Sequence, residues 1–112
     1  MNYSLHPIQY NEDDRAQRYL NVFEELGPGQ INISYVNSTD HIVAWHKHNI
    51  QIDYWCCIKG SFKVGLAGIY HGYKALEPGS ILMYYLTEKY NPADELRAHP
   101  GDFKEIWHAE NK

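Results

Sequence analysis

His46 and His48 are the residues of this sequence best suited to chemistry, and Asp53 and Gly60 follow them at short spacing. Side chains of a strand alternate between its two faces, so imidazoles two positions apart point to the same side. A short turn after His48 would start a second strand and bring Asp53 alongside, and Gly60 would end that strand at a tight turn. Two imidazoles and a carboxylate that converge inside a β structure suit proton transfer or metal binding.

Other polar groups are candidates for the same site. His71 is flanked by tyrosine and glycine, and this position suits a half-buried packing role as well as a site role. Tyr84 and Tyr85 are adjacent on an expected strand, so only one of them can point inward. The remaining histidines are expected in loops or on the surface: His6, His41, His99 and His108.

Short segments that alternate polar and apolar residues, or that are rich in apolar ones, are separated by glycine and proline turns. Helical periodicity is weak and confined to residues 14–26, and the tail after Tyr90 is polar and rich in turns. This pattern predicts an all-β sandwich or jelly roll with little helix, as one domain over residues 1–112. The expected strands are Gln30 to Val36, Val43 to His48, Ile52 to Lys59, Phe62 to Ala67, Ile69 to Ala75 and Ile81 to Thr87.

The composition limits the classes of function. With 112 residues, of which 44% are hydrophobic, the chain has room for one globular core. The net charge of -4 argues against a nucleic-acid surface, and no apolar run approaches the ~20 residues of a membrane helix. The N-terminal sequence lacks the order of a signal peptide, so we expect a cytoplasmic protein. The adjacent Cys56 and Cys57 would point opposite ways and remain two buried free thiols.

The segment from Val43 to Ala67 (VAWHKHNIQIDYWCCIKGSFKVGLA) has the spacing of the first cupin motif, with aspartate where glutamate is usual. Together with Gly68 to Arg97 (GIYHGYKALEPGSILMYYLTEKYNPADELR), it resembles the dTDP-4-dehydrorhamnose 3,5-epimerase family. The resemblance implies a cupin jelly roll, or double-stranded β-helix, that is shortened because the family's central segment is missing at the junction of residues 67 and 68. It also implies a homodimer that acts on a nucleotide-linked 4-keto-6-deoxy sugar.

The resemblance assigns roles to single residues. His46 matches the family's catalytic base and Tyr84 its acid, so an isomerase of this type would remove and return a proton beside the ketone without a cofactor. His71 matches the histidine of the family's His-Gly motif in the substrate pocket. The other residues expected to bind substrate are an aromatic pair and a cation: Trp45, Tyr73 and Lys74.

Two other functions would use the same residues. Aspartate stands where the family has its active-site lysine, which removes a positive charge that would repel a cation. A divalent metal would then have four ligands, in a dioxygenase or an isomerase: His46, His48, Asp53 and His71. The third possibility is a non-catalytic relative that binds the sugar by aromatic stacking, with these candidates: Trp45, Tyr54, Trp55, Tyr70 and Tyr73.

Overall fold

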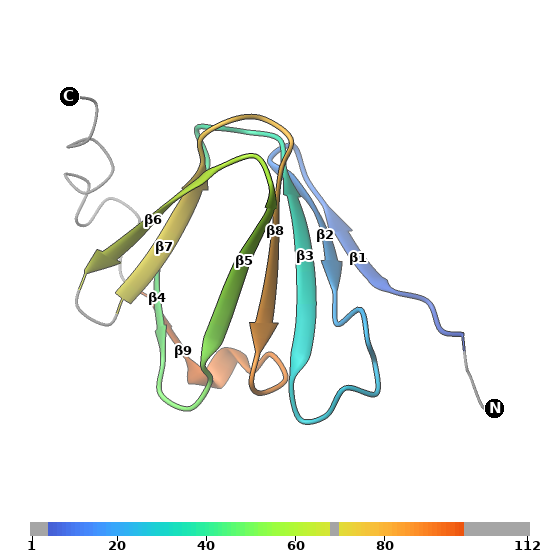
Figure 1. The fold of residues 1–112 in the computed structure, drawn as a ribbon. Coiled ribbons are helices and arrows are strands. Elements are labelled where there is room, and N and C mark those ends of the chain that lie inside the picture. The colour runs from blue at the N-terminus through green and yellow to red at the C-terminus, as the bar shows by residue number, and fades with distance from the viewer. Residues whose placement is uncertain (1–4, 68–69, 98–112) are drawn as a thin grey trace.

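The computed structural model describes residues 5–67 and 70–97, and within these ranges it contains strands and one short 3-10 turn (Figure 1). The elements are β1 (Gln9–Glu12), β2 (Ala16–Leu20), β3 (Gln30–Val36), β4 (Ile42–His48), β5 (Asp53–Lys59), β6 (Phe62–Ala67), β7 (Tyr70–Ala75), β8 (Ser80–Leu86), η1 (Pro92–Asp94) and β9 (Glu95–Arg97). No helix in the described ranges is long and apolar enough to cross a membrane.

The predicted all-β architecture is confirmed, and the predicted bounds of β3 and β6 match the structure. Several other expectations from the sequence are wrong. The segment with weak helical periodicity contains the strand β2, and the polar tail supplies η1 and β9. Cys56 and Cys57 are free thiols as expected, but both are exposed because β5 is an edge strand. His99, His108, Ile69 and the Gly68 side of the expected junction lie outside the described residues.

The strands form two facing sheets (Figure 1), one with the order β1-β2-β3-β8-β5 and one with the order β6-β7-β4-β9. From β3 onward the chain crosses between the sheets at every connection except the hairpin between β6 and β7. The crossings from β3 to β4, β5 to β6 and β7 to β8 lie at one end of the sandwich, and the connection from β4 to β5 lies at the other. This topology is that of a jelly roll.

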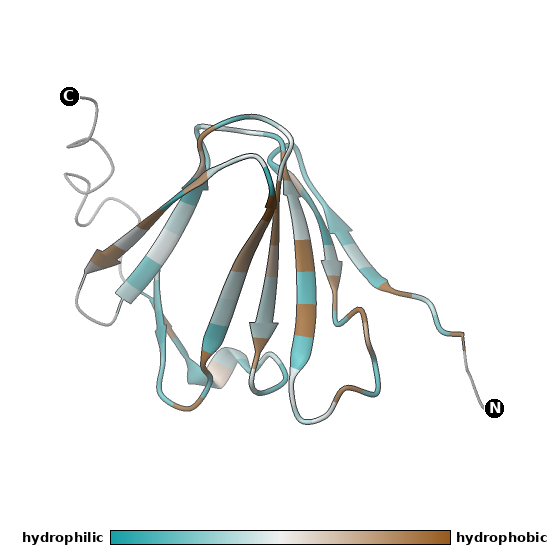
Figure 2. Cartoon of the chain, viewed as in Figure 1, coloured by the Kyte–Doolittle hydropathy of each residue, from teal (hydrophilic) through white to brown (hydrophobic). Residues whose placement is uncertain are grey.

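The interior wall of the five-stranded sheet is polar at its centre. On β3, Gln30, Asn32 and Ser34 are buried, whereas Ile31 and Ile33 point to the outer face, and polar and apolar bands alternate along this strand (Figure 2). The clustered apolar core is small: Ala16, Val36 and Ala75, with Phe62 packed against it. Because the interior does not close with apolar side chains, the two sheets leave room for a cavity between them.

The turn from β5 to β6 depends on Gly60, as the sequence predicted. Its φ angle is +77°, in the region that glycine tolerates best. A Cβ atom at this position would lie 2.2 Å from Ser80 Oγ, which accepts a hydrogen bond from the amide of Ser61. Gly60 therefore lets the hairpin pack closely on the start of β8, which pairs with β5.

Candidate active site

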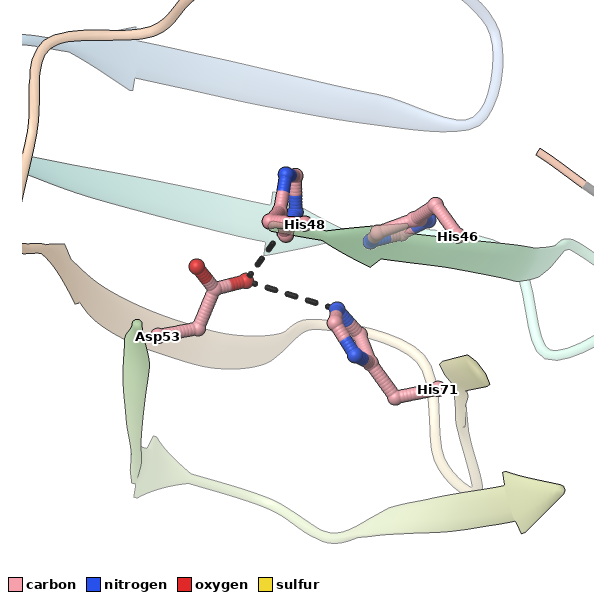
Figure 3. A group of neighbouring side chains, drawn as sticks. All are labelled: His46, His48, Asp53 and His71. Atoms are coloured by element: carbon pink, nitrogen blue, oxygen red, sulfur yellow. Dashed lines mark ion pairs between the residues drawn. The ribbon is translucent and has the colours of Figure 1, made fainter. Parts of the chain in front are cut away.

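Four side chains from both sheets converge, and one ligand atom from each lies within 4.8 Å of the others (Figure 3): His46, His48, Asp53 and His71. Asp53 Oδ2 lies 3.8 Å from His48 Nε2 and 3.5 Å from His71 Nε2. The two β4 histidines lie on one face of their strand, as predicted, and the sandwich brings β5 and β7 around them. The two distances from Asp53 are close to the spacing of neighbouring ligands around a small divalent cation.

A β-bulge in β4 determines which side chain faces this cluster. Val43 pairs with Tyr73 and His46 pairs with His71, so β4 uses one residue more than β7 between these pairs. Without the extra residue, Trp45 would stand opposite His71. The bulge instead places His46 there, with the two imidazole centroids 4.5 Å apart.

The cluster is buried and incompletely hydrogen-bonded. His46 is 8% exposed, and the side chains of His48 and Asp53 are 6% and 11% exposed. Among the described side chains, Nδ1 of His46, Nδ1 of His48 and Nε2 of His71 are buried without a hydrogen-bond partner. An unsatisfied buried polar atom costs about 1–3 kcal/mol. Of these three atoms, His71 Nε2 faces the Asp53 carboxylate, and all three are buried polar atoms that a ligand, proton or ion would satisfy.

Burial also sets the charge state of the cluster. Burial, followed by the neighbouring imidazole of His71, lowers the pKa of His46 from 6.5 to about 4. Burial alone would raise the pKa of Asp53, but contacts with His71 and Gln51 outweigh it and hold the pKa below its usual value. At neutral pH the site therefore combines a neutral His46 imidazole with an ionised carboxylate.

A cavity of about 420 Å³ between the sheets is bordered by His46, His48 and Asp53. Tyr84 and Tyr73 line the same cavity, and burial raises the pKa of both phenols, which keeps them protonated at neutral pH. The Tyr84 hydroxyl lies 3.4 Å from Ser34 Oγ. A second cavity, of about 430 Å³, lies on the His71 side of the cluster, and His48, Asp53 and Trp55 border both.

Two of the predicted substrate-binding residues lie away from the cavities. Trp45 is fully buried and is not among the residues that line either cavity. Lys74 is also outside both linings, because it alternates with Tyr73 on β7. Lys47 alternates with His46 in the same way, and its Nζ atom lies 5.2 Å from the centre of the Tyr70 ring.

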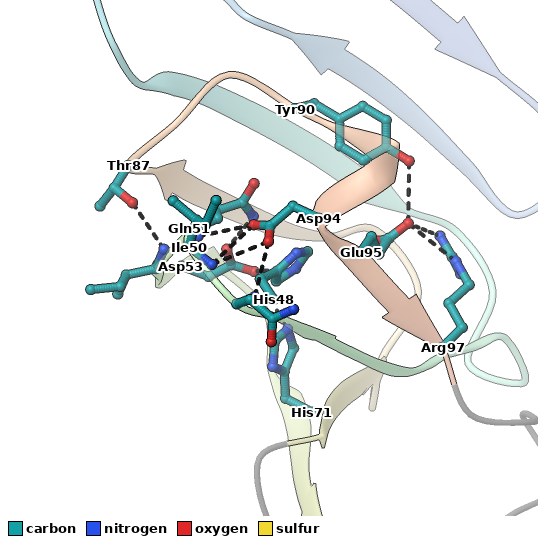
Figure 4. Close-up of polar contacts among 12 residues, drawn as sticks. His48, Ile50, Gln51, Asp53, His71, Thr87, Tyr90, Asp94, Glu95 and Arg97 are labelled. Atoms are coloured by element: carbon teal, nitrogen blue, oxygen red, sulfur yellow. Dashed lines mark hydrogen bonds and ion pairs between the residues drawn. The ribbon is translucent and has the colours of Figure 1, made fainter.

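Asp94, at the end of η1 and just before β9, supports the site and was not among the predicted site residues (Figure 4). The buried Asp94 carboxylate accepts hydrogen bonds from three successive backbone amides of the β4–β5 loop: Asn49, Ile50 and Gln51. These bonds, that of Gln51 first, hold the pKa of Asp94 below its usual value. The Asn91-Pro92 turn was visible in the sequence, but the loop amides that Asp94 binds are more than 40 positions away from it.

Glu95 and Arg97 follow on β9, pair with β4 opposite His48 and His46, and line the first cavity. Arg97 Nη2 lies 2.8 Å from Glu95 Oε2, and the hydroxyl of Tyr90 donates to the same oxygen. Arg97, paired with Glu95, therefore places a cation at the wall of the first cavity. Lys47 and Lys74 do not line this cavity.

The fold and this polar interior define a cupin-type jelly roll. No protein-family model and no curated protein sequence matches the chain. A solved structure does match: CapF, a cupin whose crystal structure contains the inhibitor 3-isopropenyl-tropolone, superposes with a TM-score of 0.66 at 15% sequence identity. The match covers 85% of this chain and 35% of CapF, so the chain spans about a third of that protein. At this identity the likeness establishes the fold alone.

The lowered pKa of His46 makes the stability of the fold depend on pH. The imidazole titrates at about 4 in the folded chain and near 6.5 when unfolded. Between these values the unfolded chain binds more protons, so the free energy of unfolding falls as the pH drops. We expect this residue to account for a loss of roughly 3 kcal/mol between pH 7 and pH 4, measured by urea unfolding.

His46→Gln should flatten this pH dependence, because glutamine does not titrate. His6→Gln removes an imidazole outside the site and should leave most of the dependence in place. Equal slopes for the wild type and His46→Gln would contradict the assignment of the low pKa to His46.

Proposed function

We propose that this cupin is an isomerase of the 3,5-epimerase type, which removes and returns a proton beside the ketone of a nucleotide-linked 4-keto-6-deoxy sugar. One observation carries the proposal. His46 and Tyr84 line the same cavity from opposite sheets, through β4 and β8. A sugar ring held between them would have a base on one face and an acid on the other, as inversion at a carbon requires.

The charge states support these roles. A base must be unprotonated to accept the proton, and the low pKa of His46 leaves it neutral at pH 7. An acid must keep its proton until the transition state, and burial does this for Tyr84. The enolate formed between the two steps needs a positive or hydrogen-bonding partner, and Arg97 at the cavity wall is the group we assign to it.

A second function, the binding of a divalent metal, is favoured by the cluster itself. Three imidazoles and one carboxylate converge within 4.8 Å, and each imidazole keeps a buried nitrogen without a hydrogen bond. Zinc and similar ions take such ligands at bond lengths near 2.0–2.2 Å. The residues therefore fit a metal, which would supply a Lewis acid beside the cavity. Because a metal would occupy His46, the two functions compete for this residue.

We also infer that two copies of the chain pack through the outer face of the five-stranded sheet. Its outward side chains are largely apolar and aromatic: Tyr10, Tyr19, Ile33, Tyr35, Tyr54, Ile58, Ile81, Met83 and Tyr85. Tyr54 and Ile58 are more than half exposed. At ~4.8 Å per strand and ~3.4 Å per residue, the face spans roughly 24 by 24 Å, of the same order as the ~800 Å² per partner of a stable dimer. The register also places Glu12 and Lys59 on this face, on the edge strands β1 and β5. Its uncharged centre can pack on a second copy without like-charge repulsion.

His46→Gln and Tyr84→Phe should each slow solvent deuterium incorporation into a dTDP-linked 4-keto-6-deoxy sugar by roughly 10²-fold or more, measured by mass spectrometry. Tyr85→Phe is the matched control, because this neighbouring phenol lies on the outer face of β8, and it should exchange at the wild-type rate. Exchange by His46→Gln at the wild-type rate would end the epimerase proposal. Sugar binding without exchange in the wild type would favour the non-catalytic alternative.

For the metal function, we expect the chain to bind about one equivalent of Co²⁺ or Zn²⁺, measured by calorimetry and metal analysis. Asp53→Asn should weaken this binding on the order of 10- to 100-fold, because the carboxylate supplies the negative charge of the ligand set. Cys56→Ser with Cys57→Ser is the control, because the two exposed thiols could bind these ions outside the cluster. Binding that disappears in the cysteine variant and persists in Asp53→Asn would place the metal elsewhere.

Light scattering on the wild-type chain should give the mass of two copies. Tyr54→Lys puts a charge on the outer face and should shift the mass toward one copy, whereas Leu76→Lys, in an exposed turn, should not. A wild-type mass of one copy at micromolar concentration would refute the dimer.

A further inference from the structure

The loop between β4 and β5 joins two members of the cluster, His48 and Asp53, and its backbone donors are all used. The amides of residues 49, 50 and 51 donate to the carboxylate of Asp94 at 3.1–3.2 Å. The fourth amide, of Ile52, donates to Thr87 Oγ1 at 2.9 Å, and the amide of Thr87 donates back to the carbonyl of Ile52 (Figure 4). The loop is thus fixed by two residues that follow β8 in the sequence.

Gln51 connects the loop to the cluster through two hydrogen bonds. The backbone amide of Gln51 donates to Asp94, and its side-chain amide donates to Asp53 Oδ1. With Oδ1 held by Gln51, the other carboxylate oxygen, Oδ2, faces the imidazoles of His48 and His71. Gln51 is itself buried, at 8% exposure, and lines both cavities.

We propose that Asp94 is a positioning residue of the site: it holds the β4–β5 loop so that Gln51 turns the Asp53 carboxylate toward His48 and His71. The inference deepens the second proposed function, metal binding, and rests on the use of Asp53, His48 and His71 as ligands there. Asp94 does not line the first cavity and acts through the loop. Its own place is secured by η1, where Asn91 accepts a hydrogen bond from the amide of Ala93.

The position of its hydrogen bonds distinguishes Asp94 from a residue that only stabilises the fold. Asp94 is 8% exposed, and the hydrogen bonds that its carboxylate accepts come from the loop between two cluster members. Loss of the carboxylate would free the three amides and allow the Asp53 side chain to turn. Charged hydrogen-bond acceptors that orient the residues around a site typically change metal affinity or activity by 10- to 100-fold.

The test uses the full chain and two variants. Asp94→Ala removes every acceptor, and Asp94→Asn keeps one carbonyl oxygen. In Asp94→Ala we expect amide hydrogen exchange of residues 49–51 to accelerate at least roughly tenfold, and the imidazole ¹⁵N signals of His48 and His71 to shift at pH 7. Asp94→Asn should restore part of both changes. Co²⁺ affinity should fall on the order of 10- to 100-fold in Asp94→Ala.

Asp14→Asn is the matched control, because it removes the same charge from an exposed loop and should change none of these signals. Unchanged imidazole signals in Asp94→Ala with released loop amides would overturn the proposal and leave Asp94 a stabilising residue. Amides that stay protected in Asp94→Ala would overturn it as well. The imidazole signals test the role of Asp94 whether or not the wild-type chain binds Co²⁺. A failure of the metal function can therefore be distinguished from a failure of this inference.

Discussion

The carboxylate of Asp53 faces the imidazoles of His48 and His71 inside the sandwich, and the arrangement of the other elements follows from this contact. A buried carboxylate is tolerated only when charged or hydrogen-bonding partners surround it. Gln51 supplies one partner directly, and the two imidazoles lie within 4 Å of its other oxygen. Asp94 holds the loop that carries Gln51, β9 pairs with β4 at His48, and the bulge in β4 sets His46 opposite His71.

A polar interior has consequences for the rest of the fold. Inward positions on β3 carry polar side chains, and two of them, Gln30 and Asn32, also accept hydrogen bonds from segments that connect the strands. Tyr90 donates its amide to Gln30, and Asn21 donates its amide to Asn32. The apolar side chains that usually fill a sandwich are instead divided between a small core at one end and the outer face of the five-stranded sheet. The cavity and the apolar outer face are thus two results of the same pattern.

The two candidate functions make the same physical demand on His46. A general base and a metal ligand both need a neutral imidazole with a free lone pair, and burial next to other imidazoles provides it by lowering the pKa. The two functions differ in which residues near His46 take part. Proton transfer uses Tyr84 across the cavity, whereas a metal uses Asp53 and the other histidines, which explains how closely related sites on one fold can support different chemistry.

The sequence by itself determined the strand pattern and the shared face of His46 and His48, because alternation along a strand is a local property of the backbone. It did not determine that His46 and not Trp45 lines the cavity, since the bulge depends on how β4 pairs with β7. It also did not determine the role of Asp94, whose partners are more than 40 positions distant. Pairing register and long-range hydrogen bonds arise only when the two sheets close on each other, so the tertiary structure decided them.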